Sequence, residues 1–326
     1  MAVVAPSNAA QAPHQRGVAV LGIFVADLAF RAASLPGVGQ TIAGSGFAMG
    51  PGGKGSNQAV AAARAGAGVT FISKLGQDAF GANALALWAQ EGITPRAPQV
   101  STQPTGAAFI YVHEVTGANA IIVVPGAAAL IDAHDVEAAA DAIRGARVFV
   151  TQLEQPAGAA RRGLELARAA GTVTVFNPAP ALPFDDALYP LCDYITPNEH
   201  EAAALSGIAV ETIDDARRAG DFFLAKGVGC ALITLGDKGA LLHSASGSLH
   251  IPVFNAGAVK ETAGAGDAFN GGFAAALAEG ASPLEAARFG SAVAAISVTR
   301  AGTAPSMPTR AEVDALMNRA VGKAVA

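Results

Sequence analysis

The chain has 326 residues, of which 52% are hydrophobic and 14% are charged, and this balance excludes an intrinsically disordered protein. The formal net charge is −5 and no dense Lys/Arg run occurs, so the sequence lacks the basic footprint of a nucleic-acid-binding protein. No stretch of about 18 uninterrupted apolar residues is present, so we predict no membrane span.

The cysteines and the N-terminal residues bear on the cellular compartment. Cys192 and Cys230 form no CxxC pair, which favours a reducing compartment over a disulfide framework. Residues 1–16 lack a basic segment followed by an apolar one, so we interpret them as a flexible extension and not as a secretion signal. Together these features predict a cytoplasmic protein.

The first part of the chain mixes two kinds of segment. One kind alternates strands with helices. We predict a buried strand that turns amphipathic within 17–30, a glycine-rich loop leading into an alanine-rich helix over 52–66, a strand over 69–76 and a helix over 79–92. The other kind is typical of antiparallel hairpin strands, over residues 41–50, 106–114 and 119–128.

From residue 131 onward, strands and helices alternate steadily. We predict helices over 131–143, 157–170, 199–206, 211–226, 266–279, 282–298 and 309–321, strands over 147–154, 173–180, 194–198 and 229–236, and hairpin pieces at 239–243 and 248–253. This pattern predicts an α/β fold with a doubly wound, mostly parallel sheet covered by helices on both faces. The early hairpin strands do not fit such a sheet, so we expect them to form a small separate one.

Polar residues occur where several predicted strands end. Ligands of open α/β sheets bind outside the carboxyl ends of the strands, so we expect these side chains to share one site. Each residue by itself is equally well explained as a helix cap, but five together favour a single site. The residues are Asp27, Glu154, Asn177, Asn198 and Thr234, the last followed by Gly236.

The stretch ETAGAGDAFNGG, residues 261–272, places two glycines before an acid at the start of a predicted helix. Gly264 and Gly266 let backbone N–H groups point toward one position, where the helix N-terminus adds about half a positive unit charge. This combination predicts a hole for phosphate oxygens. Asp267 would lie beside it as the base that takes a proton from an attacking hydroxyl. The alternative is that Asp267 only caps the helix.

A second glycine-rich loop, GGKGSNQA, precedes the alanine-rich helix. Its glycines permit close approach of a small polar ligand, and Lys54 and Asn57 supply donors, which suits a polyol. The alternative is a simple strand-to-helix turn. Residues 50–55 formally fit GxGxxG but lie outside a βαβ unit, so a dinucleotide site is not favoured. Gly55 stands where a P-loop has Ser or Thr, which excludes that motif.

Several segments together resemble one family. GGKGSNQAVAAARAG, NPAPA, TPNEHEA, ITLGDKGA, TAGAGDAFNGGF and SVTRAGTAPSMP are similar to segments of the ribokinase-like carbohydrate kinases, in the same order and at similar spacing. The resemblance runs from residue 17 to about residue 320. It implies a kinase domain over residues 17–322 with a small β-sheet lid, whose strands would lie near 24–34, 40–51 and 104–126. The apolar lid strands would leave one face of a single-layer sheet exposed, so we expect a homodimer through the lid.

The resemblance also implies an activity. It implies ATP-dependent phosphorylation of a pentose, with Mg²⁺ as a cofactor and K⁺ as an activating cation. The first candidate is D-ribose, phosphorylated at its 5-hydroxyl. Deoxyribose, fructose or a nucleoside are alternative substrates within the class. A non-catalytic sugar-binding protein is a more distant alternative, because Asp267, Gly264 and Gly266 are all intact. The expected partners are therefore a small sugar and ATP, with no nucleic acid and no membrane.

The resemblance implies a role for each matching residue. Phosphoryl transfer would use Asp267 as the base and the backbone of Ala263, Gly264, Ala265 and Gly266 as the anion hole. The sugar would be bound by Asp27, Gly53, Lys54, Asn57, Glu154 and Asp267. The nucleotide, with its magnesium, would lie along Asn198, Glu201, Thr234, Leu235, Gly236, Asp237, Lys238, Gly239, Gly266 and Ser291. The monovalent cation would be held, mainly by backbone oxygens, by Glu261, Ala263, Ser297, Arg300, Gly302 and Ser306.

The sequence departs from the family pattern at two positions. Val25 stands where the sugar-binding strand usually carries Asn, and a lost hydrogen bond in a buried polar site costs about 1–3 kcal/mol. This departure leaves the identity of the pentose open. Glu261 stands where the family usually has Asp, which moves the carboxylate by roughly one bond length, so the cation loop must adjust if it is to bind K⁺.

Overall fold

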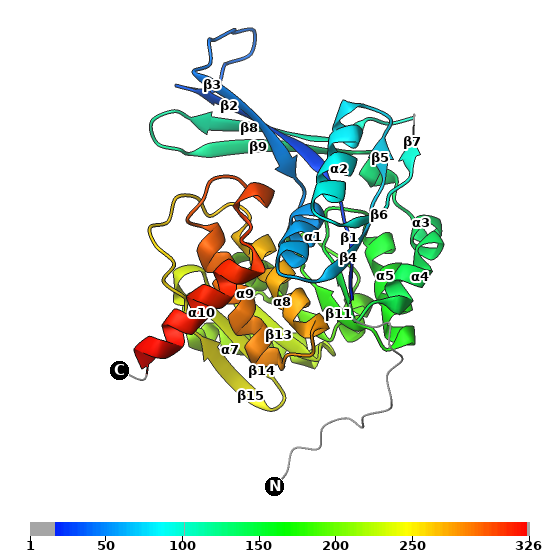
Figure 1. Cartoon of the computed structure of the whole chain (residues 1–326), viewed down its shortest axis with the longest axis vertical. Coiled ribbons are helices and arrows are strands. Elements are labelled where there is room, and N and C mark those ends of the chain that lie inside the picture. Colours follow the sequence, from blue (N-terminus) through cyan, green and yellow to red (C-terminus); the bar gives the residue numbers. More distant parts are fainter. Residues whose placement is uncertain (1–16, 101, 325–326) are drawn as a thin grey trace.

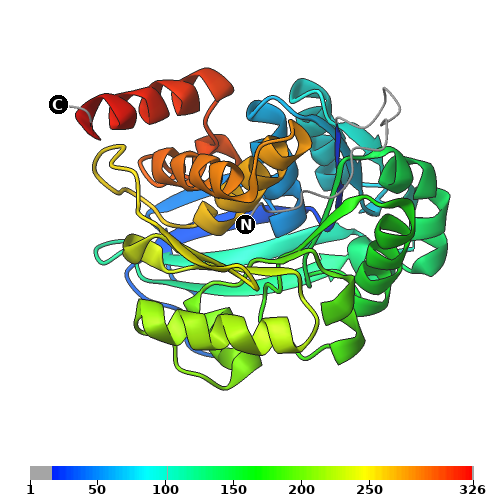
Figure 2. The same cartoon turned by 90° about the horizontal axis from the view of Figure 1, so that it is seen from below.

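The computed structural model of the protein describes residues 17–100 and 102–324, so the predicted extension at residues 1–16 lies outside the described residues. A nine-stranded sheet runs between two layers of helices, and a four-stranded sheet stands apart from it (Figure 1). In the view from below, the orange helices and the yellow-green helices lie on opposite sides of the large sheet (Figure 2). The predicted doubly wound α/β fold with a small separate sheet is therefore confirmed.

The large sheet is parallel except for one strand. Only β14 runs against its neighbours β13 and β15 among the described pairs. β1 pairs with β4 on one side and with β10 on the other, so the strand order reverses direction at β1. Such a reversal marks the place where open α/β sheets bind ligands. The spatial order is β15 (Gly247–Ile251), β14 (Ala240–Ser244), β13 (Cys230–Thr234), β12 (Tyr194–Ile195), β11 (Val173–Phe176), β10 (Val148–Thr151), β1 (Gly17–Leu21), β4 (Gly68–Ile72) and β6 (Thr94–Arg96).

The helices divide between two hydrophobic cores, one on each face of the sheet. One core is covered by α1 (Lys54–Arg64), α2 (Ala79–Gln90), α8 (Ala265–Ala278), α9 (Pro283–Ser297) and α10 (Arg310–Ala324). The other is covered by α3 (Ala133–Ala138), α4 (Ala140–Gly145), α5 (Ala157–Ala170), α6 (Glu199–Ser206) and α7 (Ile213–Ala225). The single helix predicted over 131–143 is wrong, because the helix breaks at Ala139 (φ −108°, ψ 13°). Of the helices that the structure describes, none has both the length and the apolar surface to cross a bilayer.

Glycines bring α1, α8 and α9 unusually close together. A Cβ on Gly271 of α8 would lie 2.5 Å from the Cβ of Ala61 and from the backbone oxygen of Gln58, both on α1. A Cβ on Gly272 would lie 2.6 Å from Val293 of α9. The alanine- and glycine-rich sequence of α8 therefore allows a helix spacing that larger side chains would prevent, and it brings the start of α8 against the start of α1.

The separate sheet is built from β3 (Gly46–Gly52), β2 (Val25–Ala32), β8 (Thr105–His113) and β9 (Asn119–Gly126), in that order. We call this sheet the lid. Both hairpin pairs are antiparallel as predicted, but β2 and β8 pair in parallel, from Val25 with Gly106 onward. The strand predicted over 17–30 is two strands, β1 and β2, and β3 begins only at Gly46.

Short elements complete the chain. They are β5 (Leu75–Gly76) paired with β7 (Gln99–Val100), and the 3-10 turns η1 (Ala127–Leu130), η2 (Asp186–Leu191), η3 (Gly236–Lys238) and η4 (Ala304–Ser306).

Candidate active site

Four of the five polar strand ends lie along one edge of the large sheet. Glu154 follows β10, and its Oε2 accepts the backbone N–H of Lys54 at 2.7 Å. Asn177 follows β11, and Asn198 forms a β-bridge with Thr234 at the end of β13. These residues gather at the carboxyl ends of the parallel strands, which is the edge that the fold makes available to a ligand.

Asp27 reaches the same region from a different element. It is the third residue of lid strand β2, so its assignment to a strand end of the main sheet is wrong. A Cβ on Gly52 would lie 2.2 Å from Asp27 Oδ1, so the carboxylate covers the glycine that precedes the loop at Gly53. Burial, together with the charge of Asp267, raises the pKa of Asp27 to about 6.

The loop at Gly53 and Lys54 connects β3 to α1, so the strand-to-helix turn considered for GGKGSNQA is present. Gly53 has φ 89°, and a Cβ there would lie 2.5 Å from the backbone oxygen of Ile23. A Cβ on Gly55 would lie 2.7 Å from the Cα of Gly22. The glycines are therefore needed to bring the start of α1 against the segment that follows β1, which places Lys54 and Asn57 at the ligand edge.

Asp267 lies in the first turn of α8 and is only 6% exposed. Its Oδ2 accepts a hydrogen bond from Asn57 Nδ2 at 3.0 Å, and its Oδ1 accepts one from Gln58 Nε2 at 3.1 Å. The N-cap of α8 is Gly264, in the left-handed region at φ 78°, and Asp267 bonds to α1 instead. The alternative interpretation of Asp267 as a helix cap is therefore wrong.

A half-buried lysine, Lys54, lies among carboxylates at this site. Burial works to lower the pKa of Lys54, but the negative groups around it raise that pKa above its usual value; they are Asp267, Glu154 and Glu201. Burial raises the pKa of Glu154 to about 7 against the opposing charge of Lys54. Burial also raises the pKa of Asp267, while the charge of Lys54 and the two amide hydrogen bonds oppose that rise. The site thus holds carboxylates that protonate far more readily than exposed ones.

The loop before α8 presents backbone N–H groups to solvent. The Ala265 amide donates to the Thr262 oxygen at 3.1 Å and is occupied by the turn. Within the described residues, the amides of Gly264 and Gly266 have no protein acceptor. Asn270 Nδ2 donates to the Gly266 oxygen at 2.9 Å and so steadies the loop. The predicted anion hole therefore has fewer free amides than the sequence suggested, because the Ala265 amide is already bonded.

Asn198 and Glu201 form a capping box at the start of α6. Asn198 Oδ1 accepts the Glu201 amide at 2.8 Å, and Glu201 Oε2 accepts the Asn198 amide at 2.9 Å. One donor group of Asn198 and one oxygen of Glu201 stay available. Burial raises the pKa of Glu201. The NxxE spacing thus has a local structural reason, independent of any ligand.

The turn from Thr234 to Gly239 offers a ligand mainly backbone groups and few free side chains. Leu235 is buried in the core at 5% exposure, and Lys238 Nζ donates to the Glu211 oxygen at 2.6 Å. Gly239 has φ 91°, and a Cβ there would lie 2.1 Å from the Ile251 oxygen. Gly236 and Asp237 lie exposed at the tip of the turn. The side chain of Leu235 is thus part of the core, and the ammonium group of Lys238 is engaged by Glu211.

The residues predicted to bind a monovalent cation come from two neighbouring segments. Glu261 Oε2 accepts the Gly302 amide at 2.9 Å, which ties the loop before α8 to the loop after α9. The Ser297 oxygen accepts the Arg300 amide at 3.0 Å, and Ser306 Oγ donates to the Thr303 oxygen at 2.7 Å. The Arg300 guanidinium pairs with Glu312, and Ala263 is exposed in its loop.

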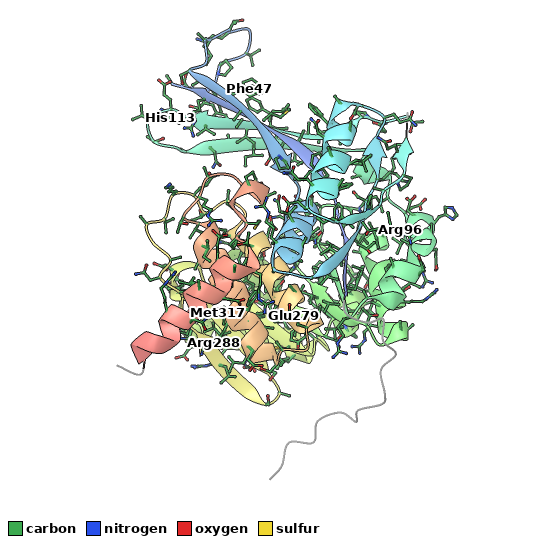
Figure 3. All side chains as sticks on the ribbon, viewed as in Figure 1. Phe47, Arg96, His113, Glu279, Arg288 and Met317 are labelled. Atoms are coloured by element: carbon green, nitrogen blue, oxygen red, sulfur yellow. The ribbon has the colours of Figure 1, made fainter. Side chains whose placement is uncertain are left out.

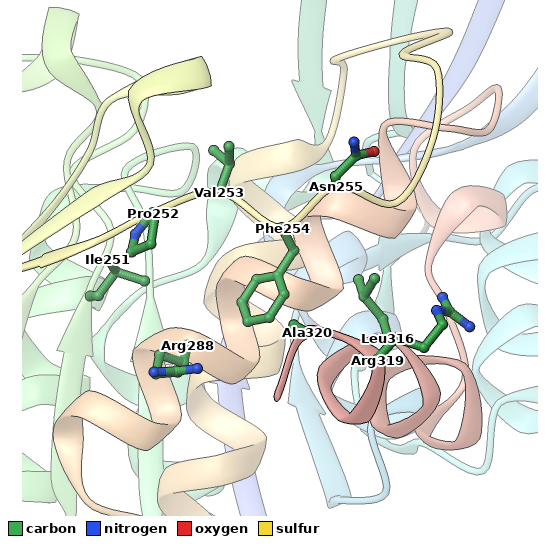
Figure 4. A pocket seen from close by; sticks show the side chains of 9 residues that line it. All are labelled: Ile251, Pro252, Val253, Phe254, Asn255, Arg288, Leu316, Arg319 and Ala320. Atoms are coloured by element: carbon green, nitrogen blue, oxygen red, sulfur yellow. The ribbon is translucent and has the colours of Figure 1, made fainter. Parts of the chain in front are cut away.

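A cavity of about 350 Å³ lies beside this region, between the segment after β15 and helices α9 and α10 (Figure 4). Phe254 points into it, and Arg288 and Arg319 flank it. Ser291, predicted to lie near the adenine, is buried on α9 and does not line this cavity. None of the other predicted site residues lines it either.

Two buried glutamines at the site were missed from the sequence. Gln58 contacts Asp267 directly, and Gln152 Nε2 donates to Gln58 Oε1 at 2.6 Å. The available signals were a glutamine among alanines and valines of α1, and the polar run TQLEQ directly after a buried strand. Both residues lack the charge or glycine pattern that marks a site in sequence.

The protein combines a doubly wound α/β domain and a lid with a buried carboxylate, which lies beside free amides at a glycine-rich helix start. This is the architecture of a small-molecule kinase. The family described as pfkB family carbohydrate kinase matches residues 15–310, and the chain belongs to this family. It is therefore a carbohydrate kinase.

Individual relatives are similar over nearly their whole length. A ribokinase of Haemophilus influenzae is 41% identical over 91% of this chain and 97% of its own. A deoxyribokinase of Salmonella typhi is 35% identical over 90% and 95%, respectively. The structure of Arabidopsis thaliana ribokinase complexed with ribose and ATP superposes with a TM-score of 0.86 at 30% identity, covering 93% of this chain and 99% of that one.

Proposed function

We propose that the protein transfers the terminal phosphoryl group of ATP to the 5-hydroxyl of a pentose, with D-ribose as the first candidate. The observation that supports this proposal most directly is the buried Asp267 carboxylate, which Asn57 and Gln58 hold beside the free amide of Gly266. The similarity to ribokinases, one of them bound to ribose and ATP, supports this assignment.

The sugar would lie between the lid and the start of α1. Asn57 Oδ1 is buried and has no hydrogen-bond partner among the described residues, so it can accept a sugar hydroxyl. Lys54 supplies a cationic donor, and Asp27 and Glu154 supply acceptors from the lid and from the end of β10. Each of these groups suits the hydroxyls of a small polyol. A buried polar atom left unpaired costs free energy that such a ligand would recover.

Asp267 would act as the base. It would take the proton of the attacking hydroxyl as that oxygen bonds to phosphorus and the bond to the leaving nucleotide breaks. The Gly264 and Gly266 amides, at the positive end of α8, would stabilise the charge on the transferring group.

ATP and Mg²⁺ fit the residues near α6 and η3. No cluster of three or more His, Cys, Asp or Glu in the described part of the chain could hold a metal by itself. Mg²⁺ is usually held by one or two carboxylates together with substrate phosphates, and Glu201, with one free oxygen, suits that arrangement. When bound, Mg²⁺ neutralises phosphate charge. Asn198 and the backbone from Thr234 to Gly239 would contact the nucleotide.

K⁺ activation is a further part of the proposal. Glu261 already bridges to Gly302, so its longer side chain is accommodated by the loop. Backbone oxygens of the two loops, at Ala263, Ser297, Arg300, Gly302 and Ser306, would supply most of the ligands. These loops adjoin the phosphate end of the site, so an ion there would order the anion hole.

A 2-deoxypentose is the second candidate substrate, because Val25 makes part of the sugar wall apolar. Val25 is 3% exposed and packs in the core with Ala108 and Ile131. It lies two residues before Asp27 on β2, so both side chains are on the same face of the lid. An apolar wall imposes no cost on a sugar that lacks one hydroxyl. The similarity to a deoxyribokinase supports this candidate. We retain fructose and nucleosides as test substrates.

We also infer a homodimer through the lid. Large apolar side chains are exposed there, including Phe47 at 62% and Ile122 at 64%, and Figure 3 labels Phe47 on the lid. Phe30, Phe47 and Phe109 form one aromatic row, with ring centroids 5.0 and 5.7 Å apart. Such a row needs a covering surface. The cytoplasmic location stays a prediction.

The deciding experiment measures ADP formation by the purified protein with Mg²⁺ and K⁺. The sugars compared are ribose, 2-deoxyribose, fructose and nucleosides. Turnover that is fastest with ribose supports the first candidate, and turnover fastest with 2-deoxyribose supports the second. Turnover only with a hexose or a nucleoside would overturn both.

A further inference from the structure

The two amides that hold Asp267 have different surroundings. Asn57 Oδ1 is buried and has no hydrogen-bond partner among the described residues. Gln58 is 1% exposed, and its amide is fully used by protein partners: Nε2 donates to Asp267 Oδ1 and to Asn177 Oδ1, both at 3.1 Å, and Oε1 accepts from Gln152. Gln58 therefore serves the carboxylate and has no N–H donor left for a substrate.

The neighbours of Gln58 fix which way its amide faces. An ionised carboxylate only accepts hydrogen bonds, so the NH₂ group must face Asp267. Asn177 turns its own NH₂ to the Thr196 oxygen at 2.8 Å and so presents an acceptor to Gln58. Gln152 presents a donor to Gln58 Oε1 at 2.6 Å. Reversing the Gln58 amide would set donors against donors and an acceptor against the carboxylate.

Glycines hold Gln152 in place at the point where the strand order reverses. A Cβ on Gly22, after β1, would lie 2.5 Å from Gln152 Oε1, and one on Gly55 of α1 would lie 3.0 Å from it. Only residues without a side chain leave room for this amide. The glycines of the sugar loop thus also support the contact between Gln152 and Gln58.

We propose that Gln58 is a positioning residue for the phosphoryl-transfer base: it orients the Asp267 carboxylate and keeps it ionised, and Gln152 fixes Gln58. This inference rests on the proposed role of Asp267. A protonated Asp267 would meet only N–H donors from Asn57 and Gln58, so its proton would have no acceptor among them. Without Gln58, burial would favour the neutral acid more strongly.

Other charges act on Asp267 and must stay constant in a test. They are Lys54 on α1, Asp27 on β2, Glu154 after β10 and Glu201 on α6. None of them has a hydrogen bond to Gln58 or Gln152 among the described contacts. Changes at these two glutamines therefore leave the neighbouring charges in place.

The test compares Gln58→Met with the unaltered protein. Methionine keeps the length of the side chain and removes its donor. We expect the Asp267 pKa, measured by carboxyl ¹³C NMR of ligand-free protein and assigned with Asp267→Asn, to rise by about one pH unit. We expect kcat to fall about 10- to 100-fold, with its acid limb moved to higher pH, while KM for the sugar stays close to the unaltered value.

Two further sets of variants separate positioning from general damage. Thr172→Val is the control, because Thr172 is also buried but its Oγ1 donates to the Ile143 and Ala146 oxygens and not to Gln58 or Gln152, and it should leave both titrations unchanged. Gln152→Met should shift the Asp267 pKa and the acid limb of kcat in the same direction as Gln58→Met does, but by a smaller amount. The double variant of Gln58 and Gln152 should be no worse than Gln58→Met alone, since the two act as a chain.

An Asp267 pKa that does not move in Gln58→Met, or that moves equally in Thr172→Val, would overturn the proposal. So would a loss of activity that only follows the folded fraction. The NMR titration needs no substrate, so it still decides the role of Gln58 if the protein phosphorylates no pentose, a result that would count against the proposed function alone.

Discussion

The carboxylate of Glu154 accepts the backbone N–H of Lys54 at 2.7 Å and so joins the end of β10 to the start of α1 across 100 residues of sequence. This contact joins the loop after the lid strand β3 to the strand end after β10, and Asn57, three residues after Lys54, joins the same loop to Asp267 at the start of α8. The lysine and the surrounding carboxylates perturb one another's pKa because they lie close together in a partly buried site. The following predictions test this arrangement.

Replacing the proposed base should stop turnover and spare nucleotide binding. Asp267→Asn keeps the size of the side chain and removes the proton acceptor, so kcat should fall by about 10²- to 10⁴-fold. Calorimetry should show ATP affinity close to that of the unaltered protein. Near-normal turnover in this variant would contradict the role of Asp267.

The stability of the ligand-free protein should fall as pH rises through the range set by Glu154. Its pKa is raised from 4.5 to about 7, so the folded protein keeps this proton where the unfolded chain has lost it. The unfolded state then binds fewer protons, and the free energy of unfolding decreases between these two pH values. The raised pKa of Asp27 acts in the same direction from about pH 4 to pH 6.

Thermal unfolding between pH 4.5 and pH 7 checks this sign. Glu154→Gln should flatten the dependence, because the amide oxygen can still accept from Lys54 and cannot titrate. Glu114→Gln, an exposed change, serves as the control. A thermal unfolding midpoint that rises with pH across this range in the unaltered protein would contradict the raised pKa of Glu154.

The sugar loop should not tolerate a side chain at Gly53. Its φ is 89°, and a Cβ at this position would lie 2.5 Å from the Ile23 oxygen. We therefore expect Gly53→Ala to cost about 1–3 kcal/mol in the free energy of unfolding. Gly68→Ala is the matched control, since a Cβ there meets nothing within 4 Å. Equal stability of the two variants in denaturant unfolding would refute the steric argument.

Val25 should set the preference between pentoses. Val25→Asn restores a hydrogen-bonding group to the lid strand, so the ratio of kcat/KM for ribose over 2-deoxyribose should rise about 10-fold. The measurement uses both sugars with the same protein preparation, and Val25→Leu is the apolar control. An unchanged ratio in Val25→Asn would mean that Val25 does not face the hydroxyl that distinguishes the two sugars.

A charge on the exposed face of the lid should separate the proposed dimer. Phe47→Glu places a carboxylate in the aromatic row with Phe30 and Phe109. Light scattering at micromolar concentration should report a dimer for the unaltered protein and a monomer for this variant. Leu249→Glu, on the exposed edge strand β15, should remain dimeric. A monomeric unaltered protein would refute the lid interface.

Much of this site was predictable because its residues carry local signals. Glycines before an acid at a helix start indicated Asp267 as a candidate base. The GGKG loop indicated Lys54 and Asn57 as candidate donors to a polyol. Gln58 and Gln152 could not be recognised this way, because a buried glutamine acquires its role only from partners up to 209 residues away. The occupied Ala265 amide was equally hidden, since it depends on the geometry of one turn.

The sequence alone determined the element types, the doubly wound sheet and the glycine-rich loops, since periodicity and glycine positions act over a few residues. The tertiary structure decided which residues meet: the parallel pairing of β2 with β8, the lid position of Asp27, and the approach of α1 to α8 that lets Gln58 reach Asp267. That approach depends on Gly271 meeting Ala61 across two helices. Contacts of this kind follow from how the helices pack on the sheet, and no local pattern encodes them.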